Sequence, residues 1–167
     1  NPMEVASFVN RHQITEMLFT PTLFQNILSQ IPRKKILSSM KSLRTVYFNG
    51  EVLSKDLAQR SMLCLPNVRF INVYSISECH EVSAVDVSML QLGDKQGGFC
   101  PVGYPSPLSP LYILDDNLLQ VKDGDSGELY VSGPLLAREY LNMKKTTQER
   151  FKMNPYREDY VNGGDHR

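Results

Sequence analysis

The sequence predicts an α/β protein, with a mainly parallel sheet and flanking helices followed by a small antiparallel β-barrel-like subdomain. Helical and strand patterns alternate over residues 1–92, four prolines interrupt residues 101–110, and two short apolar runs follow around a loop rich in Asp and Gly. The 167 residues are 41% hydrophobic and 22% charged, as in an ordinary globular domain.

In the first part, Thr20-Pro21 forms a good N-cap and N1 pair for a helix that ends before Pro32. Its apolar residues repeat at helical spacing, and they are Leu23, Phe24, Ile27, Leu28 and Ile31. Thr45–Phe48 is a short β-branched and aromatic strand, and Ser54 caps a second helix. Val68–Tyr74 is the next strand, and strands joined by helical crossovers pair in parallel.

The second part begins after the polar connector from Gly93 to Gly98, where closely spaced prolines exclude a helix. Leu111–Leu114 and Glu128–Val131 are predicted antiparallel strands, and Leu135–Leu141 a helical turn. We therefore expect an α/β subdomain over 1–98, a β-rich subdomain over 99–150 and a connecting segment over 151–167.

The composition excludes several functional classes. Lys+Arg 18 balance Asp+Glu 18, so no basic surface recruits nucleic acid or anionic lipid. The sequence has no membrane-spanning apolar run and no signal-peptide pattern. The three cysteines form no C-x-x-C pair, which favours a reducing, cytoplasmic location. The abrupt ends indicate a piece of a longer protein.

Residues 72–78 are the leading candidate site, because ligands of open α/β sheets bind outside the carboxyl ends of the strands. Tyr74 offers a flat face to a purine, Ser77 a hydroxyl to a phosphate, and Glu78 a carboxylate to Mg²⁺. The alternative is a strand-to-helix turn, with Ser77 as the cap and Glu78 in the first helical turn.

Asn49-Gly50-Glu51 ends the preceding strand, and its glycine would let a planar ring approach the backbone. The alternative is a glycine turn with an exposed Glu. Two further motifs are discounted. Cys79-His80 lacks additional ligands and cannot form an ion pair through adjacency, and the loop at residues 123–128 departs from a calcium loop, so it is interpreted as a hairpin turn.

Four stretches, in order along the chain, resemble motifs of the adenylate-forming superfamily, specifically the adenylation domains of nonribosomal peptide synthetases and their stand-alone relatives. Residues 48–53 resemble the adenine loop Gly-Gly-Glu-Ala-Leu, and residues 72–78 resemble Asn-x-Tyr-Gly-Pro-Thr-Glu. Residues 127–141 are the most specific match, close to Gly-Glu-Leu-x-Ile-x-Gly-x-Gly-Leu-Ala-Arg-Gly-Tyr-Leu. Gly163-Gly164-Asp165 resembles the end of Tyr-Arg-Thr-Gly-Asp.

The resemblance implies that the intact protein uses ATP and Mg²⁺ to convert a carboxylic acid into an acyl adenylate. An amino acid is the expected substrate. The acyl group would then pass to the phosphopantetheine thiol of a carrier-protein domain. The resemblance implies that Tyr74 stacks on adenine, Asp165 holds the ribose, Ser77 contacts the α-phosphate and Glu78 binds Mg²⁺. The remaining nucleotide-binding residues it implies are Asn49, Gly50, Glu51 and Asn72.

The residues that flank these motifs would line the pocket for the acid. By resemblance they are Leu18, Tyr47, Asn49, Val73, Glu81 and Val82.

The resemblance places no catalytic residue in this chain. The phosphate loop would lie before Asn1, and a C-terminal domain with the catalytic Lys would lie after Arg167, so this chain alone is expected to be inactive. Ser75-Ile76 replaces Gly-Pro, and Asn49 replaces the first glycine of the adenine loop. Two alternatives stay open: an acyl-CoA ligase, and a decayed adenylation domain that acts as an interaction module.

Overall fold

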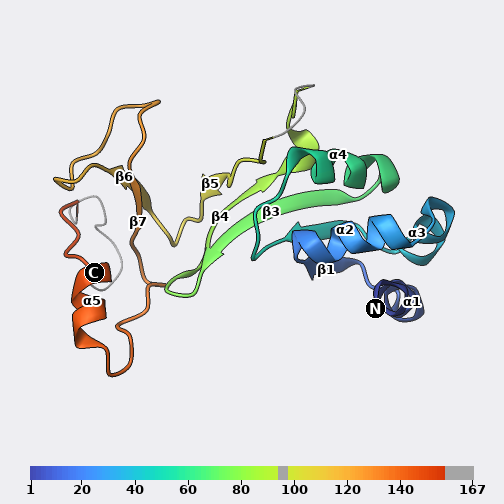
Figure 1. The fold of residues 1–167 in the computed structure, drawn as a ribbon, viewed down its shortest axis with the longest axis horizontal. Helices are drawn as coiled ribbons and strands as arrows, with labels where there is room; N and C mark the ends of the chain where they lie inside the picture. Colours follow the sequence, from blue (N-terminus) through green and yellow to red (C-terminus); the bar gives the residue numbers. More distant parts are fainter. Residues whose placement is uncertain (94–97, 157–167) are drawn as a thin grey trace. The chain divides into compact units, whose positions relative to one another are not determined.

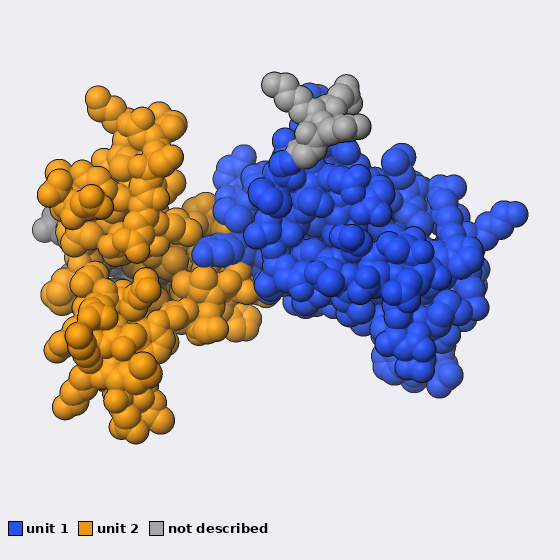
Figure 2. Space-filling view, viewed as in Figure 1, with its two compact units in different colours: residues 1–74, 84–104 blue, residues 75–83, 105–167 orange. Residues whose placement is uncertain are grey.

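The computed structural model describes residues 1–93 and 98–156, and the chain divides into two compact units (Figures 1 and 2). Unit 1 contains residues 1–74 and 84–104, and unit 2 contains residues 75–83 and those from 105 onward. The subdomain boundaries at residues 98 and 150 stay predictions. No helix in the described residues is both long and apolar enough to cross a bilayer.

The described strands form a five-stranded sheet with the order β1-β2-β3-β4-β5 and a two-stranded sheet of β6 and β7 (Figure 1). The strands are β1 (Glu16–Phe19), β2 (Thr45–Phe48), β3 (Arg69–Ile76), β4 (His80–Asp86), β5 (Tyr104–Pro105), β6 (Leu111–Leu114) and β7 (Glu128–Val131). The helices are α1 (Pro2–His12), α2 (Pro21–Gln30), α3 (Arg33–Ser39), α4 (Lys55–Cys64), the 3-10 turn η1 (Val87–Met89) and α5 (Lys144–Arg150).

The pairing of β1, β2 and β3 is parallel, as the helical crossovers predict. Helices α2 and α3 connect β1 to β2, and α4 connects β2 to β3. In the register, Phe19 lies opposite Phe48, and Phe48 lies opposite Asn72. Strands β1 and β2 therefore end at one level, opposite Asn72, whereas β3 continues to Ile76. The segments that follow β1 and β2 emerge at the same edge of the sheet.

The helix starts predicted at Thr20 and Ser54 are confirmed. The Thr20 hydroxyl accepts a hydrogen bond from the Leu23 N–H at 3.3 Å, and the Ser54 hydroxyl accepts one from the Leu57 N–H at 3.2 Å. Each bond satisfies one of the N–H groups that a helix leaves unpaired in its first turn. These local caps explain why both helices could be located from sequence alone.

An aromatic cluster forms the centre of unit 1, on the sheet face that α2 and α4 cover (Figure 1). The Phe24 ring, on α2, lies 5.1 Å from the ring of Phe19 and 5.3 Å from that of Phe48. Both pairs meet edge-on, and Phe70 stacks on Phe48 at 5.9 Å. Edge-on and offset contacts add to the free energy gained from burying these rings.

Five further elements in residues 1–93 were not predicted, namely α1, β1, α3, β4 and η1. The unpredicted β4 corrects one interpretation, because β3 is followed by a turn over residues 77–79 and then by its neighbouring strand. A three-residue connection can join only antiparallel strands. The alternative in which Ser77 caps a helix is therefore wrong, since strand pairing with β4 overrides the local capping pattern.

In unit 2, β6 and β7 pair antiparallel as predicted, with Leu111 opposite Val131 and Leu114 opposite Glu128. In the described residues they form a two-stranded sheet and not a closed barrel. The Asp125 N–H donates to the Lys122 carbonyl at 3.0 Å, so residues 122–125 form a turn and not a calcium loop. The helical turn expected over Leu135–Leu141 is wrong: one turn spans Gly133–Leu136, and residues 137–140 are irregular.

We predict that Phe24→Ala destabilises unit 1 by about 3–5 kcal/mol, because Phe24 is fully buried among three other rings. In the intact protein, the β2 amides that exchange only through global unfolding should exchange roughly 100-fold faster or more. Phe8→Ala is the control, since Phe8 is 51% exposed. Equal exchange in the two variants would contradict the placement of the core.

Candidate functional site

The loop after β2 joins the sheet edge to the start of α2. Gly50 has a φ of 84°, a left-handed conformation that favours glycine, and its N–H donates to the Asn49 side-chain oxygen at 2.6 Å. The Glu51 carboxylate accepts hydrogen bonds from the Thr22 N–H at 2.9 Å and the Thr22 hydroxyl at 2.5 Å. The loop is therefore built by its own polar residues, and Glu51 is exposed but not free.

The hydrogen bonds from Thr22 lower the pKa of Glu51, because they stabilise the ionised carboxylate; the hydroxyl has the larger effect and the backbone N–H the next. Thr22 lies in the first turn of α2, where the helix dipole also favours a negative charge. Glu51 therefore stabilises both the loop and the beginning of the helix.

Asn72 lies on the core side of β3 and is 5% exposed. Its side-chain amide donates to the Pro101 carbonyl at 2.8 Å, which fixes the segment that leads to β5. Gly103 follows in this segment with a φ of 91°, and a Cβ there would lie 2.1 Å from the Ala84 carbonyl oxygen. Only glycine fits this close approach of the segment to β4.

Three of the residues predicted to contact the acid share one face of the sheet in unit 1. Leu18 lies directly opposite Tyr47 in the β1–β2 register, and Ile71 lies opposite Tyr47 in the β2–β3 register. Val73 is two residues beyond Ile71 and so points to the same side. This face is the opposite of the aromatic core, and Leu18 on it is 53% exposed.

Tyr47 adds polar character to that face. Its hydroxyl donates to the Glu16 carboxylate at 3.2 Å, so a phenol and a carboxylate stand beside the apolar side chains. Glu81 and Val82, also predicted to contact the acid, lie on β4 in unit 2. Glu81 is exposed, whereas Val82 is fully buried.

The turn between β3 and β4 carries Ser77 and Glu78, with Ser77 exposed and Glu78 half-buried. The Glu78 backbone carbonyl accepts a hydrogen bond from the Ala137 N–H at 2.6 Å, and its carboxylate accepts one from the Tyr140 hydroxyl. The hydrogen bond to Glu78 is the main cause that raises the pKa of Tyr140, because it stabilises the protonated phenol.

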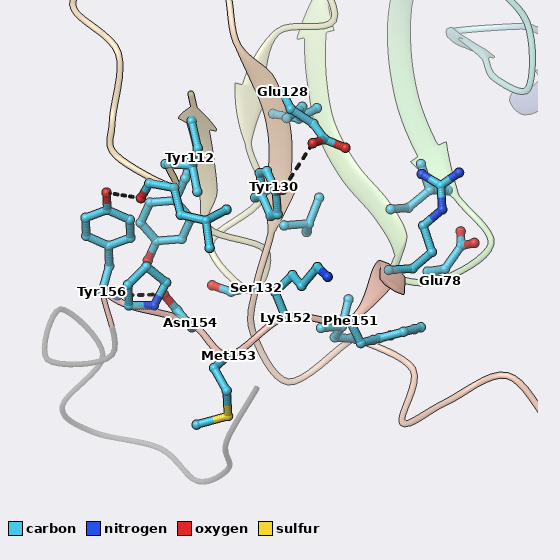
Figure 3. Close-up of a pocket in the computed structure, with 18 of the residues that line it drawn as sticks. Glu78, Tyr112, Glu128, Tyr130, Ser132, Phe151, Lys152, Met153, Asn154 and Tyr156 are labelled. Atoms are coloured by element: carbon cyan, nitrogen blue, oxygen red, sulfur yellow. Dashed lines mark hydrogen bonds between the residues drawn. The ribbon is translucent and has the colours of Figure 1, made fainter. Parts of the chain in front are cut away.

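Glu78 stands near a cavity of about 380 Å³ within unit 2 (Figure 3). Its walls are β6, β7 and the chain after α5. The Tyr156 ring stacks on Tyr112 at 5.1 Å, and the Tyr156 hydroxyl donates to the Leu118 carbonyl at 2.9 Å. Sequence reasoning placed Tyr140 in a motif but missed its contact with Glu78, which joins residues far apart in the chain. It also missed this cavity, because the segment after α5 that forms one of its walls has no apolar periodicity.

No group of three or more His, Cys, Asp or Glu side chains in residues 1–93 and 98–156 is placed to hold a metal ion. A lone carboxylate such as Glu78 fits the way Mg²⁺ binds beside a nucleotide, with one or two carboxylates and the phosphates as ligands. Cys79 is buried, with its sulfur 3.7 Å from the Ser109 hydroxyl, and His80 is exposed. Asp165, predicted to hold the ribose, lies outside the described residues.

The family model described as AMP-binding enzyme matches residues 1–141. The chain belongs to the AMP-binding enzyme family. The match covers the loop after β2, the turn with Glu78, and Tyr140, so the resemblance stated from the motifs is confirmed at the level of the family.

Three curated relatives illustrate the range of proteins to which the chain is similar. The chain is 38% identical over 156 residues to the glycine betaine reductase ATRR of Emericella nidulans, covering 93% of this chain and 12% of the relative. It is 34% identical over 160 residues to the indigoidine synthase of Dickeya dadantii, covering 93% and 10%. It is 32% identical over 115 residues to the D-alanine–D-alanyl carrier protein ligase of Streptococcus pyogenes, covering 68% and 22%.

The chain thus spans between 10% and 22% of the length of these relatives. Among solved structures, the nonribosomal peptide synthetase FmoA3 in its α-methyl-L-serine-AMP bound form has a TM-score of 0.80 and 23% identity, over 93% of this chain and 17% of that one. An artificially fused adenylation–PCP didomain of Klebsiella oxytoca, NpsA-ThdA, has a TM-score of 0.77 and 20% identity, over 93% and 28%. Both likenesses confirm the α/β fold.

We predict that Glu51→Gln lowers the melting temperature at neutral pH and removes part of its pH dependence. A carboxyl group whose pKa is lowered by folding stabilises the fold above its unfolded value of 4.5, and this stabilisation is lost as the pH falls through the folded pKa. The difference in melting temperature between wild type and variant should therefore be largest above pH 4.5 and shrink below it. A difference that is constant with pH would show that the charge of Glu51 has no part in holding Thr22.

Proposed function

We propose that the intact protein activates a carboxylic acid with ATP, forming an acyl adenylate, and passes the acyl group to the thiol of a carrier protein. The observation that carries the proposal is that two motif stretches of an AMP-binding enzyme meet in the fold. Residues 72–78 and 127–141 are far apart in sequence, yet Glu78 is bonded to Ala137 and Tyr140. A chain that keeps this long-range connection keeps the architecture around its proposed metal ligand.

In the first step, a carboxylate oxygen of the acid bonds to the α-phosphorus of ATP. The bond from that phosphorus to the bridging oxygen breaks, and pyrophosphate leaves with the electron pair. In the second step, the thiol sulfur bonds to the acyl carbon, AMP leaves, and the thiol proton is released. When bound, Mg²⁺ offsets the negative charge of the phosphates.

The residues of this chain bind and orient, and none is a nucleophile. We propose that Tyr74 stacks on the adenine, Ser77 donates to the α-phosphate, Glu78 is the Mg²⁺ ligand and Asp165 holds the ribose hydroxyls. Around them, Asn49, Gly50, Glu51 and Asn72 complete the nucleotide contacts. Holding the reactants in line in this way lowers the entropic part of the barrier.

For the acid, we propose a pocket lined by Leu18, Tyr47, Asn49, Val73, Glu81 and Val82. The apolar face of β1 to β3, with the Tyr47 phenol and Glu16 beside it, suits an acid that has both an apolar part and a polar or cationic end. The names of the relatives justify a panel of amino acids and glycine betaine as test substrates.

The acceptor and the location are further parts of the proposal. We propose a phosphopantetheine-bearing carrier domain as acceptor, supported by a relative named as a carrier protein ligase and a neighbour solved as an adenylation–PCP didomain. A cytoplasmic location is supported by the three cysteines, all of which are free. The balanced charge supports no nucleic-acid partner.

Substrate-dependent exchange of pyrophosphate into ATP by the intact protein tests the activity. We expect exchange with at least one acid of the panel, and acyl transfer to a carrier domain in preference to coenzyme A. Preferred transfer to coenzyme A would make the protein an acyl-CoA ligase. The decayed-domain alternative is favoured by Ser75-Ile76 and predicts no exchange at all.

Thermal shift separates the decayed domain from an enzyme whose acid is missing from the panel. We predict that MgATP at a hundred times its Kd stabilises the intact protein by about 2.7 kcal/mol, since a ligand that binds only the folded state stabilises it by RT ln(1 + c/Kd) at a free ligand concentration c. The shift should appear with no acid present. An unshifted melting temperature at millimolar MgATP would contradict nucleotide binding, and with it the proposed function.

We predict that Glu78→Gln lowers turnover at saturating MgATP by roughly 100-fold or more, because the substitution keeps the shape of the side chain and removes the charge that a hard divalent cation prefers. The melting temperature without nucleotide should be nearly unchanged. Glu139→Gln is the control, since Glu139 is an exposed carboxylate in the same part of the chain. Unaltered turnover of Glu78→Gln across Mg²⁺ concentrations would remove Glu78 from the site.

A further inference from the structure

The hydrogen bond between Tyr140 and Glu78 can fix the orientation of the Glu78 carboxylate. Glu78 sits on the turn between β3 and β4 and is half-buried. Two bonds from the residue 127–141 stretch hold it, one from the Ala137 N–H to the backbone and one from the Tyr140 hydroxyl to the carboxylate. In the described part of the chain, the carboxylate forms no salt bridge.

Tyr140 is itself held from two sides. Its backbone N–H donates to the Thr147 hydroxyl at 3.0 Å, and its ring meets the Phe151 ring edge-on at 5.4 Å and 74°. Thr147 belongs to α5 and Phe151 is the residue that ends this helix. Helix α5 buries none of its residues and so contributes nothing to the core. Its contacts with Tyr140 are therefore a function of this helix that does not depend on core packing.

The chemistry of a phenol suits this task. A tyrosine hydroxyl donates one directional hydrogen bond and carries no charge, so it fixes one carboxylate oxygen and leaves the negative charge of Glu78 intact. The carboxylate then has further lone pairs for a cation. Partners of this kind fix the orientation of metal ligands in proteins, and their loss costs about 10- to 100-fold in metal affinity.

We propose that Tyr140 is a positioning residue that presents the Glu78 carboxylate to the divalent cation of the nucleotide complex, and that Thr147 and Phe151 hold Tyr140 in place. This inference rests on the proposed function, in which Glu78 is the Mg²⁺ ligand. Tyr140 touches neither nucleotide nor acid in this arrangement and acts through Glu78 alone.

The test compares Tyr140→Phe with Tyr130→Phe in the intact protein. Tyr130 offers a matched control, because its hydroxyl donates to the Glu128 carboxylate at 3.0 Å in the same unit. Both variants lose one Tyr–Glu hydrogen bond and keep the ring. Mn²⁺, titrated by electron paramagnetic resonance against protein saturated with a non-hydrolysable ATP analogue, reports metal affinity without turnover.

We expect Tyr140→Phe to weaken Mn²⁺ binding about 10- to 100-fold, to raise the Mg²⁺ concentration for half-maximal turnover by a similar factor, and to leave the KM for the acid unchanged. Tyr130→Phe should bind Mn²⁺ like the wild type. Equal Mn²⁺ affinity in the two variants would overturn the proposal and leave Tyr140 as a purely structural contact.

If Tyr140→Phe does not fold, Thr147→Val provides a second test, because it removes the hydroxyl that holds the Tyr140 backbone while keeping the phenol. This variant should weaken Mn²⁺ binding by a smaller factor than Tyr140→Phe, and unchanged affinity overturns the proposal.

Two outcomes keep this inference separate from the proposed function. A wild-type protein that binds no Mn²⁺–nucleotide complex contradicts the proposed function itself. A wild-type protein that binds the complex, together with a Tyr140→Phe variant that binds it equally well, contradicts only the role of Tyr140.

Discussion

The parallel register of β1, β2 and β3 is the constraint on which the rest of unit 1 depends. Phe19, Phe48 and Asn72 lie at one level across the three strands, so the start of α2 and the loop at 49–51 emerge together, beside Asn72 of β3. A slip of one residue in β2 would exchange the faces to which Phe48 and Tyr47 point, which would expose a core ring and bury a phenol. The aromatic cluster around Phe24 makes that slip costly, and packing in the core thereby fixes the geometry of the sheet edge.

Several polar motif residues stabilise the fold through their own contacts. The Asn72 amide holds the Pro101 carbonyl, and the Glu51 carboxylate holds the first turn of α2. Each satisfies a backbone group that would otherwise be unpaired at an irregular segment. Ligand binding and loop construction therefore use the same side chains in the proposed site, and a substitution there changes both.

The parts of the fold that the sequence predicted are those with local signals. The caps at Thr20 and Ser54 and the apolar periodicity after them located α2 and α4, and the crossovers then implied parallel strands. Helix α5 has no buried residue and therefore no periodicity, and β4 begins at His80 with a φ of 63° that propensity does not anticipate. The motif around Tyr74 and Glu78 was found by resemblance. The stretch that contains Tyr140 was found in the same way, but its contact with Glu78 was not, because that contact exists only once residues 62 positions apart meet in unit 2.

Glu51 and Glu78 are both held by hydroxyl groups, Thr22 and Tyr140, and in the described residues neither forms a salt bridge. A Lys or Arg partner would orient a carboxylate equally well, but it would neutralise the charge and would have to be displaced, with its own desolvation cost, before a cation could bind. A neutral donor avoids that competition, because it fixes one oxygen and leaves the net charge of the group unchanged. At Glu51 the same choice leaves a negative charge beside the N-terminus of α2, where the helix dipole stabilises it. Orientation by hydroxyl groups thus lets a carboxylate be fixed in place and still keep its charge.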